Sequence, residues 1–183
     1  MLVQHHLALA FETAHVQEPL TWELTRRFQR MLFNVSALNV GVHEADMRLV
    51  FVGEAKEVAA AKVYLKDLGV KVRTLSSRRY PGRLPRAVRM PARRANGNRV
   101  ERKLWLTIIR GQRREPYLWK LGREFDLGYK ITHSVSGQNM AIVSLVVWGE
   151  AQEVERAVTY LRQNGVTVEY GEAGLSAPFM PVD

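Results

Sequence analysis

The chain has 183 residues, enough for one ordinary domain or two small ones, and 46% hydrophobic with 25% charged residues is typical of a globular protein. It has no cysteine, which excludes a disulfide framework, thiolate metal sites and a thiol nucleophile. No apolar run reaches the roughly 18–20 residues that a membrane helix needs, and the N-terminus has no basic signal-peptide region. We therefore expect a cytoplasmic protein without a membrane span.

The net charge of +9 comes from one segment of the chain. Residues 76–103 contain ten Lys and Arg residues and a single acid, Glu101, whereas the charges of the two flanking regions sum to zero. The high isoelectric point of about 10.2 is therefore a property of this segment and does not indicate a basic surface everywhere.

Two regions of the chain repeat each other. Residues 53–72 and 149–168 are identical at eleven of twenty positions, at a spacing of 96, and the residues before them match at a spacing of 97. The matched pairs at a spacing of 97 include Leu7 with Leu104, Glu18 with Glu115, Trp22 with Trp119, and Phe28 with Phe125. We therefore divide the chain into a first repeat (1–75), an arginine- and proline-rich linker (76–103), a second repeat (104–171) and an irregular tail (172–183).

Each repeat predicts the same order of elements. Alternating apolar residues predict a first strand, and a Glu-Pro pair then opens a helix, because proline is tolerated in the first helical turn. Two strands follow, near 34–41 and 46–53 in the first repeat and near 129–136 and 140–148 in the second. A second helix ends at Gly69 or Gly165, before a last strand. This βαββαβ order predicts two ferredoxin-like α+β units in tandem, arranged as a pseudo-twofold pair.

The third strand of each repeat is apolar on both faces. Val50 and Val52 alternate with Leu49 and Phe51, and residues 142–148 are apolar apart from one serine. An antiparallel sheet with one solvated face would alternate between apolar and polar residues. We therefore expect the outer face of the sheet to be covered by the other repeat or by a second chain.

The basic linker contains three prolines, so we expect an extended, partly ordered segment through which neither helix nor strand runs. Its charge would bind phosphates without sequence preference and with a steep salt dependence; the alternative is a solvated linker. A nucleic-acid partner would contact its arginines, of which we select Arg78, Arg79, Arg83, Arg86, Arg93 and Arg94.

No catalytic constellation stands out from the sequence. There is no His-Glu-x-x-His motif and no phosphate-binding glycine loop, and the histidines are isolated or adjacent on a strand. Glu18 and Glu115 precede prolines at helix starts, where acids favour the helix dipole. We therefore expect no enzymatic activity, no metal and no cofactor.

Both repeats resemble NIL domains, the small modules at the C-terminus of methionine importer ATPases that also occur fused to ferredoxins. The resemblance covers each repeat in full and rests on the Glu-Pro pair, Gly53 or Gly149, and a Tyr-Leu-x-x-x-Gly-Val stretch that starts at Tyr64 or Tyr160. It implies a regulatory small-molecule site, for methionine in the importers, where two domains pair. The Asn-Ile-Leu tripeptide of the family is replaced by residues 36–38 and 132–134.

The second strands carry small polar residues, and a strand at a sheet edge presents unpaired backbone groups. The helix starts nearby offer backbone donors to a carboxylate. We therefore predict that the second strands and helix starts of the two repeats line a shared cleft, with His133 as its most distinctive side chain; the alternative is that the pairing is only structural. The predicted ligand-binding residues are Glu18, Ser36, Leu38, Glu115, Thr132, His133 and Ser134.

The sequence thus favours a non-catalytic regulatory protein that binds a small molecule such as a sulfur amino acid. One alternative is a nucleic-acid-associated protein that uses the basic linker. Another is a protein-interaction or oligomerisation module, which would bind a protein partner or form a homodimer.

Overall fold

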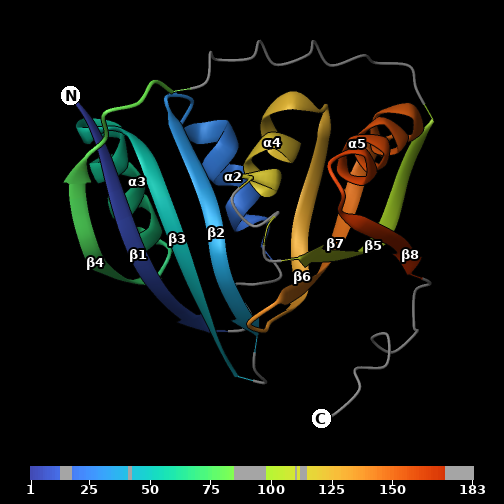
Figure 1. Ribbon diagram of the computed structural model, residues 1–183, viewed down its shortest axis with the longest axis horizontal. Coiled ribbons are helices and arrows are strands. Elements are labelled where there is room, and N and C mark those ends of the chain that lie inside the picture. The colour runs from blue at the N-terminus through green and yellow to red at the C-terminus, as the bar shows by residue number, and fades with distance from the viewer. Residues whose placement is uncertain (13–17, 41–42, 85–97, 110, 112–114, 172–183) are drawn as a thin grey trace.

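The computed structural model of the chain describes residues 1–12, 18–40, 43–84, 98–109, 111 and 115–171, which form two successive βαββαβ units (Figure 1). The elements of the first unit are β1 (Leu2–Glu12), α2 (Leu20–Arg27), β2 (Met31–Val40), β3 (Glu44–Glu54), α3 (Ala55–Asp67) and β4 (Lys71–Arg79). The elements of the second unit are β5 (Arg99–Ile109), α4 (Tyr117–Glu124), β6 (Leu127–Ser136), β7 (Met140–Glu150), α5 (Ala151–Gln163) and β8 (Thr167–Gly171). Among these described elements, none of the helices has the length and hydropathy of a membrane span.

The two sheets have the same topology. The strand order is β2-β3-β1-β4 in the first unit and β6-β7-β5-β8 in the second, and neighbouring strands are antiparallel. This confirms the tandem ferredoxin-like fold predicted from the repeat. Each unit buries an apolar core between its sheet and its two helices, and the core includes Leu7, Leu49, Leu65, Leu104, Leu145 and Leu161.

Strands enter both ends of the segment that the sequence analysis treated as a linker. β4 continues to Arg79 and β5 begins at Arg99, so the expected linker bounds of 76 and 103 both lie inside strands. The first proline of the segment, Pro81, lies just beyond β4, and the strand can therefore keep pairing with β1 up to that point.

Glycines end the second helix of each unit, as predicted. Gly69 and Gly165 have φ angles of 82° and 83°. Glycine adopts this left-handed conformation at little energetic cost because it has no Cβ. The backbone N–H of the next residue, Val70 or Val166, then donates to a carbonyl of the last helical turn. The chain can thus reverse into β4 and β8, which complete the sheets.

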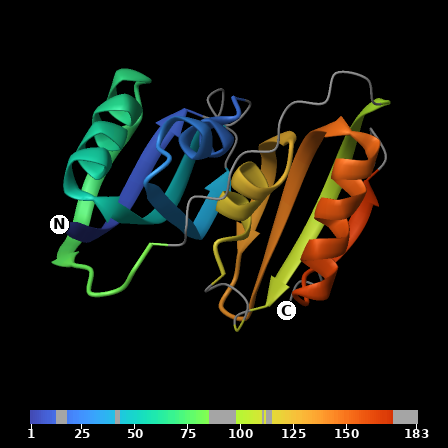
Figure 2. The same cartoon turned by 90° about the horizontal axis from the view of Figure 1, so that it is seen from above.

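The units lie side by side with their second strands, β2 and β6, adjacent and running in the same direction (Figure 1). The helices α3 and α5 lie on opposite sides of the pair (Figure 2), so the pseudo-twofold axis runs along the strands. α2 packs against α4 near this axis. Thr25 and Gly122, which are equivalent in the two repeats, meet there: a Cβ on Gly122 would lie 2.2 Å from Thr25 Oγ1.

Two equivalent tryptophans join the units through reciprocal hydrogen bonds. Trp22 Nε1 donates to the backbone carbonyl of Leu127 at 2.9 Å, and Trp119 Nε1 donates to that of Met31 at 2.8 Å. The acceptors are themselves equivalent, 96 residues apart. Such a pair of contacts is the signature of an isologous interface, here formed within a single chain.

The same arrangement covers part of each sheet's outer face. The Trp22 ring of α2 lies 6.0 Å from the ring of Trp148 on β7. The Trp148 ring also packs over Gly128, and a Cβ added to Gly128 would lie 2.2 Å from that ring. In the first unit, the equivalent of Trp148 is Val52, which is 5% exposed. The outer face was expected to be covered by the other repeat or by a second chain, and at this end of β7 the other repeat covers it through Trp22.

Candidate functional site

A cavity opens at the junction of the two units, on the side of the second unit. It measures about 620 Å³, a volume that includes open solvent at its mouth. Its walls are β2 and the start of α4, and Leu106, Ile108 and Val143 of the second sheet form an apolar floor. The structure therefore places a cavity where the sequence predicted a shared cleft.

Ser134 supplies an unusual polar group to the cavity wall. The residue is 2% exposed, and its Oγ has no hydrogen-bond partner among the described residues. Buried hydroxyls are nearly always paired, and an unpaired one costs about 1–3 kcal/mol. A polar ligand atom in the cavity would satisfy this hydroxyl.

Ser136, two residues further along β6, is engaged with the first unit instead. The backbone N–H of Leu38 donates to Ser136 Oγ at 3.4 Å, and this hydroxyl also reaches the Leu38 carbonyl at 3.5 Å. These contacts tie the edge of β2 to the edge of β6 where both strands line the cavity. A ligand in the cavity would therefore touch both units.

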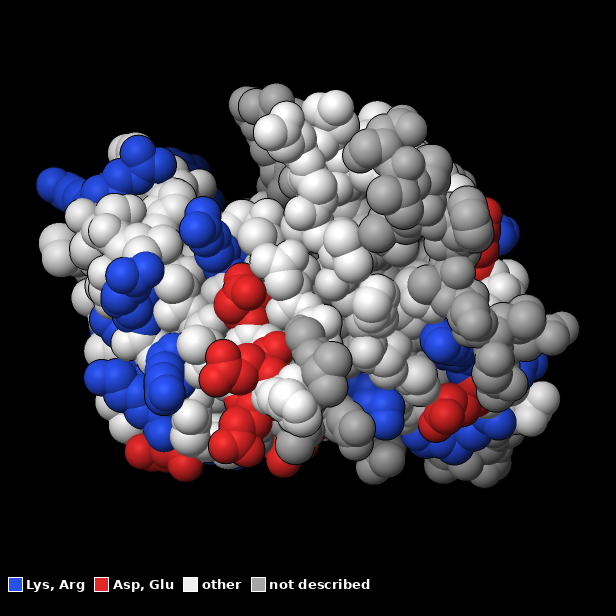
Figure 3. Space-filling model, turned by 90° about the horizontal axis from the view of Figure 1, so that it is seen from below, with Lys and Arg blue, Asp and Glu red and all other residues white. Residues whose placement is uncertain are grey.

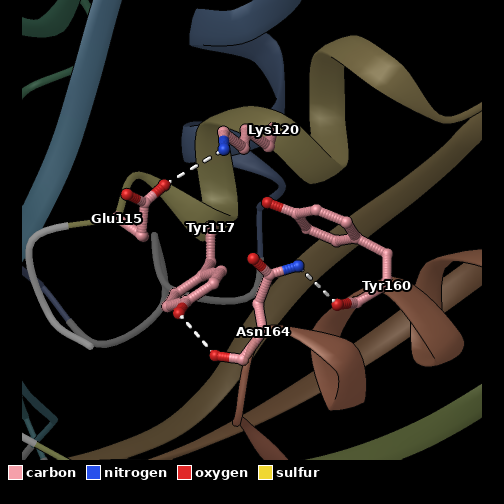
Figure 4. Close-up of polar contacts among 5 residues, drawn as sticks. All are labelled: Glu115, Tyr117, Lys120, Tyr160 and Asn164. Atoms are coloured by element: carbon pink, nitrogen blue, oxygen red, sulfur yellow. Dashed lines mark hydrogen bonds and ion pairs between the residues drawn. The ribbon is translucent and has the colours of Figure 1, made fainter.

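The start of α4 forms the charged rim of the cavity. No side chain caps this helix at Pro116, and the first backbone amides of a helix favour anions. Glu115, beside them, forms an ion pair with Lys120 at 3.0 Å (Figure 4). Burial alone would lower the pKa of Lys120, but its hydrogen bonds to Glu115 and Tyr160 outweigh burial and raise the pKa, which favours the charged form of Lys120.

Tyr117, the first residue of α4, fixes one wall of the cavity. Its ring is buried, and its hydroxyl donates to the backbone carbonyl of Asn164 at 3.2 Å, while Asn164 Nδ2 donates to the Tyr160 carbonyl (Figure 4). Burial, followed by the charge of Glu115, raises the pKa of Tyr117, so the phenol stays a hydrogen-bond donor. The wall is therefore anchored to the end of α5.

A second, smaller cavity of about 250 Å³ occupies the equivalent place in the first unit. Glu18 lines it, as Glu115 lines the larger cavity. The difference in size follows from the side chains, because those of the first unit are bulkier and fill the space. The three bulkier residues are Phe11, Leu38 and Met47, and their counterparts in the second unit are Ile108, Ser134 and Val143.

The predicted ligand-binding residues fall into three groups. The larger cavity is lined by Ser36, Leu38, Glu115 and Ser134, and the smaller one by Glu18, with Leu38 shared between the two. Thr132 and His133 line neither of these cavities.

The placement predicted for His133 is wrong. The pairing of β6 with β7 shifts register between Ile131 and His133, and this bulge turns His133 to the outer face of the sheet. Its ring lies there 5.8 Å from the ring of Trp105. Thr132, at the bulge, hydrogen-bonds to Ser144 of β7 and so also lies away from the cavity.

The larger cavity is also lined by residues outside the predicted set, among them Tyr117 and Asn34. Tyr117 follows Pro116 at a helix start, where an apolar ring is typical of core packing, so its position gave no signal. Asn34 is a polar residue in the otherwise apolar first half of β2, and this contrast was a usable signal.

The described arginines among those selected in the basic segment line neither of the two cavities. Arg78 and Arg79 belong to β4, and Arg83 is exposed beyond it. Arg86, Arg93 and Arg94 lie outside the described residues.

In the part of the chain that the structure describes, no group of three or more His, Asp or Glu side chains is placed to hold a metal ion.

No protein-family model matches the chain. No curated protein matches it either. The resemblance to NIL domains is therefore neither supported nor contradicted by these searches, and it stays a prediction.

Solved structures that align with the chain do so loosely. A protein described as a glycine cleavage system transcriptional repressor is 8% identical, with a TM-score of 0.32, over 93% of this chain and 97% of its own. The small subunit of acetolactate synthase from Thermotoga maritima is 21% identical, with a TM-score of 0.29, over 93% and 99%. A chlorite dismutase from Candidatus Nitrospira defluvii is 9% identical, with a TM-score of 0.26, over 88% and 82%. At such TM-scores the alignments carry no argument about function, and the fold rests on the strand order.

Proposed function

We propose that this chain is a non-catalytic, regulatory binding protein whose paired units hold a small ligand in the larger cavity. The observation that carries the proposal is the buried, unpaired hydroxyl of Ser134 in a largely apolar cavity between the units. A ligand there would contact β2 of one unit and α4 of the other. Its binding would therefore favour the paired arrangement, which is how a ligand signal would reach the rest of the molecule.

The chemistry of the walls favours an amino acid with an apolar side chain. The floor of Leu106, Ile108 and Val143 would take the side chain. The uncapped start of α4 would take the carboxylate, and the Glu115 carboxylate would take the ammonium group. The resemblance to NIL domains makes methionine the first ligand to test.

The test is a thermal-unfolding screen with the twenty amino acids, followed by titration calorimetry of any that stabilise the chain. A ligand at a hundredfold excess over its Kd stabilises the folded state by about 2.7 kcal/mol. N-acetyl-methionine and methionine amide, which lack one head-group charge each, should bind more weakly than methionine if both charges are used. If none of the amino acids stabilises the chain, the proposal of an amino-acid site is wrong.

The two repeats provide matched variants for this experiment. Glu115→Gln should weaken binding of the free amino acid and leave binding of its N-acetyl derivative unchanged. Glu18→Gln makes the same change at the smaller cavity and should have no effect. Ser134→Ala should weaken the ligand that pairs with the hydroxyl. Equal effects of Glu115→Gln and Glu18→Gln would remove the larger cavity as the site.

A further inference from the structure

The outer face of the first sheet carries a shallow groove over its central strand. Leu7 and Leu9 of β1 point into the core. Because side chains alternate along a strand, Ala8 and Ala10 face the outer side of the sheet. They form the floor of an open groove of about 820 Å³. Because flanking strands lie about 4.8 Å from the central one, the side chains on the two sides of the groove start about 10 Å apart.

Arginines face each other across this floor. Ala8 pairs with Arg48 of β3 on one side and with Arg73 of β4 on the other. Ala10 likewise pairs with Lys71, and with Asp46, which accepts a hydrogen bond from the Asn39 side chain at 3.2 Å. Figure 3 shows Lys and Arg side chains gathered over the first unit, with acidic side chains beside them toward the middle of the molecule.

The cations of the groove are available to a ligand. Arg48, Lys71 and Arg73 are exposed, and their side chains have no hydrogen bond or ion pair with the described residues. Further along the same face of β4, Arg78 pairs with Gln4 of β1. The row of positive charge therefore follows β4 and leads directly into the basic segment that follows it.

The second unit lacks this groove although it has the same fold. Trp105 stands where the first unit has Ala8, and its cross-strand neighbours are Ser144 and Glu169 in place of the two arginines. The equivalent row thus has a large ring on its floor and one negative charge at its side. The repeats have diverged so that only one outer face is both open and positive.

Protection of a sheet edge does not account for this pattern. Charged residues on an edge strand such as β4 prevent it from pairing with other chains, which would explain Lys71 and Arg73. Arg48 lies on β3, an interior strand of the sheet, where no edge needs protection. The open alanine floor between the arginines is also unnecessary for that purpose.

We infer that the groove over Ala8 and Ala10 binds a single nucleic-acid strand through its phosphates. Arg48 and Arg73 hold a phosphate between them above the small Ala8 side chain, and Arg78 contacts the next phosphate along β4. None of the described residues that line the groove is aromatic, so the bases are not stacked and the strand is bound without sequence preference. This site is independent of the amino-acid cavity between the units.

The test measures the affinity of the full chain for a labelled, mixed-sequence single-stranded oligonucleotide by fluorescence anisotropy at several salt concentrations. Arg48→Gln/Arg73→Gln should weaken binding by about tenfold or more at low salt. It should also reduce the slope of log affinity against log salt by about 0.7, because the two arginines together neutralise one phosphate and each neutralised phosphate on a single strand contributes about 0.7. The control Lys56→Gln/Lys66→Gln removes equal charge from exposed positions on α3 and should leave both quantities unchanged.

A second variant separates the groove from its charge. Ala8→Leu fills the floor with an aliphatic side chain that cannot stack on bases while all the cations stay in place, so binding should weaken. Far-ultraviolet circular dichroism verifies the fold of this variant.

Several results would overturn the inference. If the arginine variant binds as well as the lysine control, the strand does not lie in the groove, and the basic segment alone accounts for any binding. If a filled floor leaves the affinity unchanged, the cations act without the groove. If duplex DNA of the same sequence or poly-glutamate binds as tightly as the oligonucleotide, the surface does not select a single nucleic-acid strand.

Discussion

Replacing Trp119 by Phe should destabilise the chain more than the same change at Trp22, although the two residues are equivalent. The buried bond from Trp119 Nε1 reaches the Met31 carbonyl, to which no second side chain donates among the described residues. A buried group left without its partner costs about 1–3 kcal/mol. The Leu127 carbonyl, by contrast, accepts from both Trp22 and Arg26, the latter at 3.3 Å. The loss of Trp22 therefore removes only one hydrogen bond, worth about 0.5–1.5 kcal/mol net.

The comparison is made by urea unfolding followed by far-ultraviolet circular dichroism, because removal of a tryptophan changes the fluorescence of the chain. Each free energy of unfolding is obtained by linear extrapolation, and an unchanged m-value shows that the same surface unfolds in each variant. Trp119→Phe should lower the midpoint further than Trp22→Phe. Equal losses, or a larger loss for Trp22→Phe, would refute the argument from the acceptor carbonyls.

Three further outcomes follow from the packing and the charges. Leu161→Ala should cost about 2–5 kcal/mol in urea unfolding, because the residue is fully buried; a loss below about 1 kcal/mol would contradict the assigned helix face. Gly122→Ala should cost about 1–3 kcal/mol through its clash with Thr25, and Thr25→Gly should relieve that loss if the two residues meet at the axis. Burial and the hydrogen bond to Glu23 raise the pKa of Tyr64 to about 12. The protonated Tyr64 phenol should therefore stabilise the fold below about pH 10, and this stabilisation should be lost as the pH rises to about 12. Absorbance titration of Tyr64→Phe against the parent protein measures the pKa of Tyr64, and an unshifted pKa would contradict the argument.

The repeat made most of the fold predictable, because each local signal occurs twice. Pro19 and Pro116 stand at the N-caps of α2 and α4, where the Glu-Pro pairs predicted helix starts. Gly69 and Gly165 have the left-handed conformation that their place after a helix predicted. These signals depend on short stretches of backbone, and the same stretch gives the same result in both units.

The placement of His133 was not predictable for the opposite reason. Alternation along a strand predicts which residues share a face only while the register is continuous. The bulges after Val35 and Ile131 contain no glycine or proline, so the sequence gives no sign of them. One extra residue at each bulge reverses the faces of all the residues that follow.

The arrangement of the two units was also beyond the sequence. Apolar third strands indicated a covered outer face, but several coverings satisfy that condition. The choice of α2 and α4 as covers depends on hydrogen bonds from Trp22 and Trp119 to carbonyls about a hundred positions away in the chain. The acceptors are backbone carbonyls, which every residue has, so the amino-acid sequence does not indicate which ones accept these hydrogen bonds.

Joining the two units in one chain has a consequence for how many ligands the proposed site would hold. In a homodimer of a single unit, both junction cavities would be identical by symmetry, and each substitution would change both. Here the covalent link lets one cavity close with Phe11 and Met47 while its counterpart stays open. The fusion also makes the association of the units intramolecular, and therefore independent of protein concentration. A binding isotherm should accordingly saturate at one ligand per chain and show no cooperativity between halves.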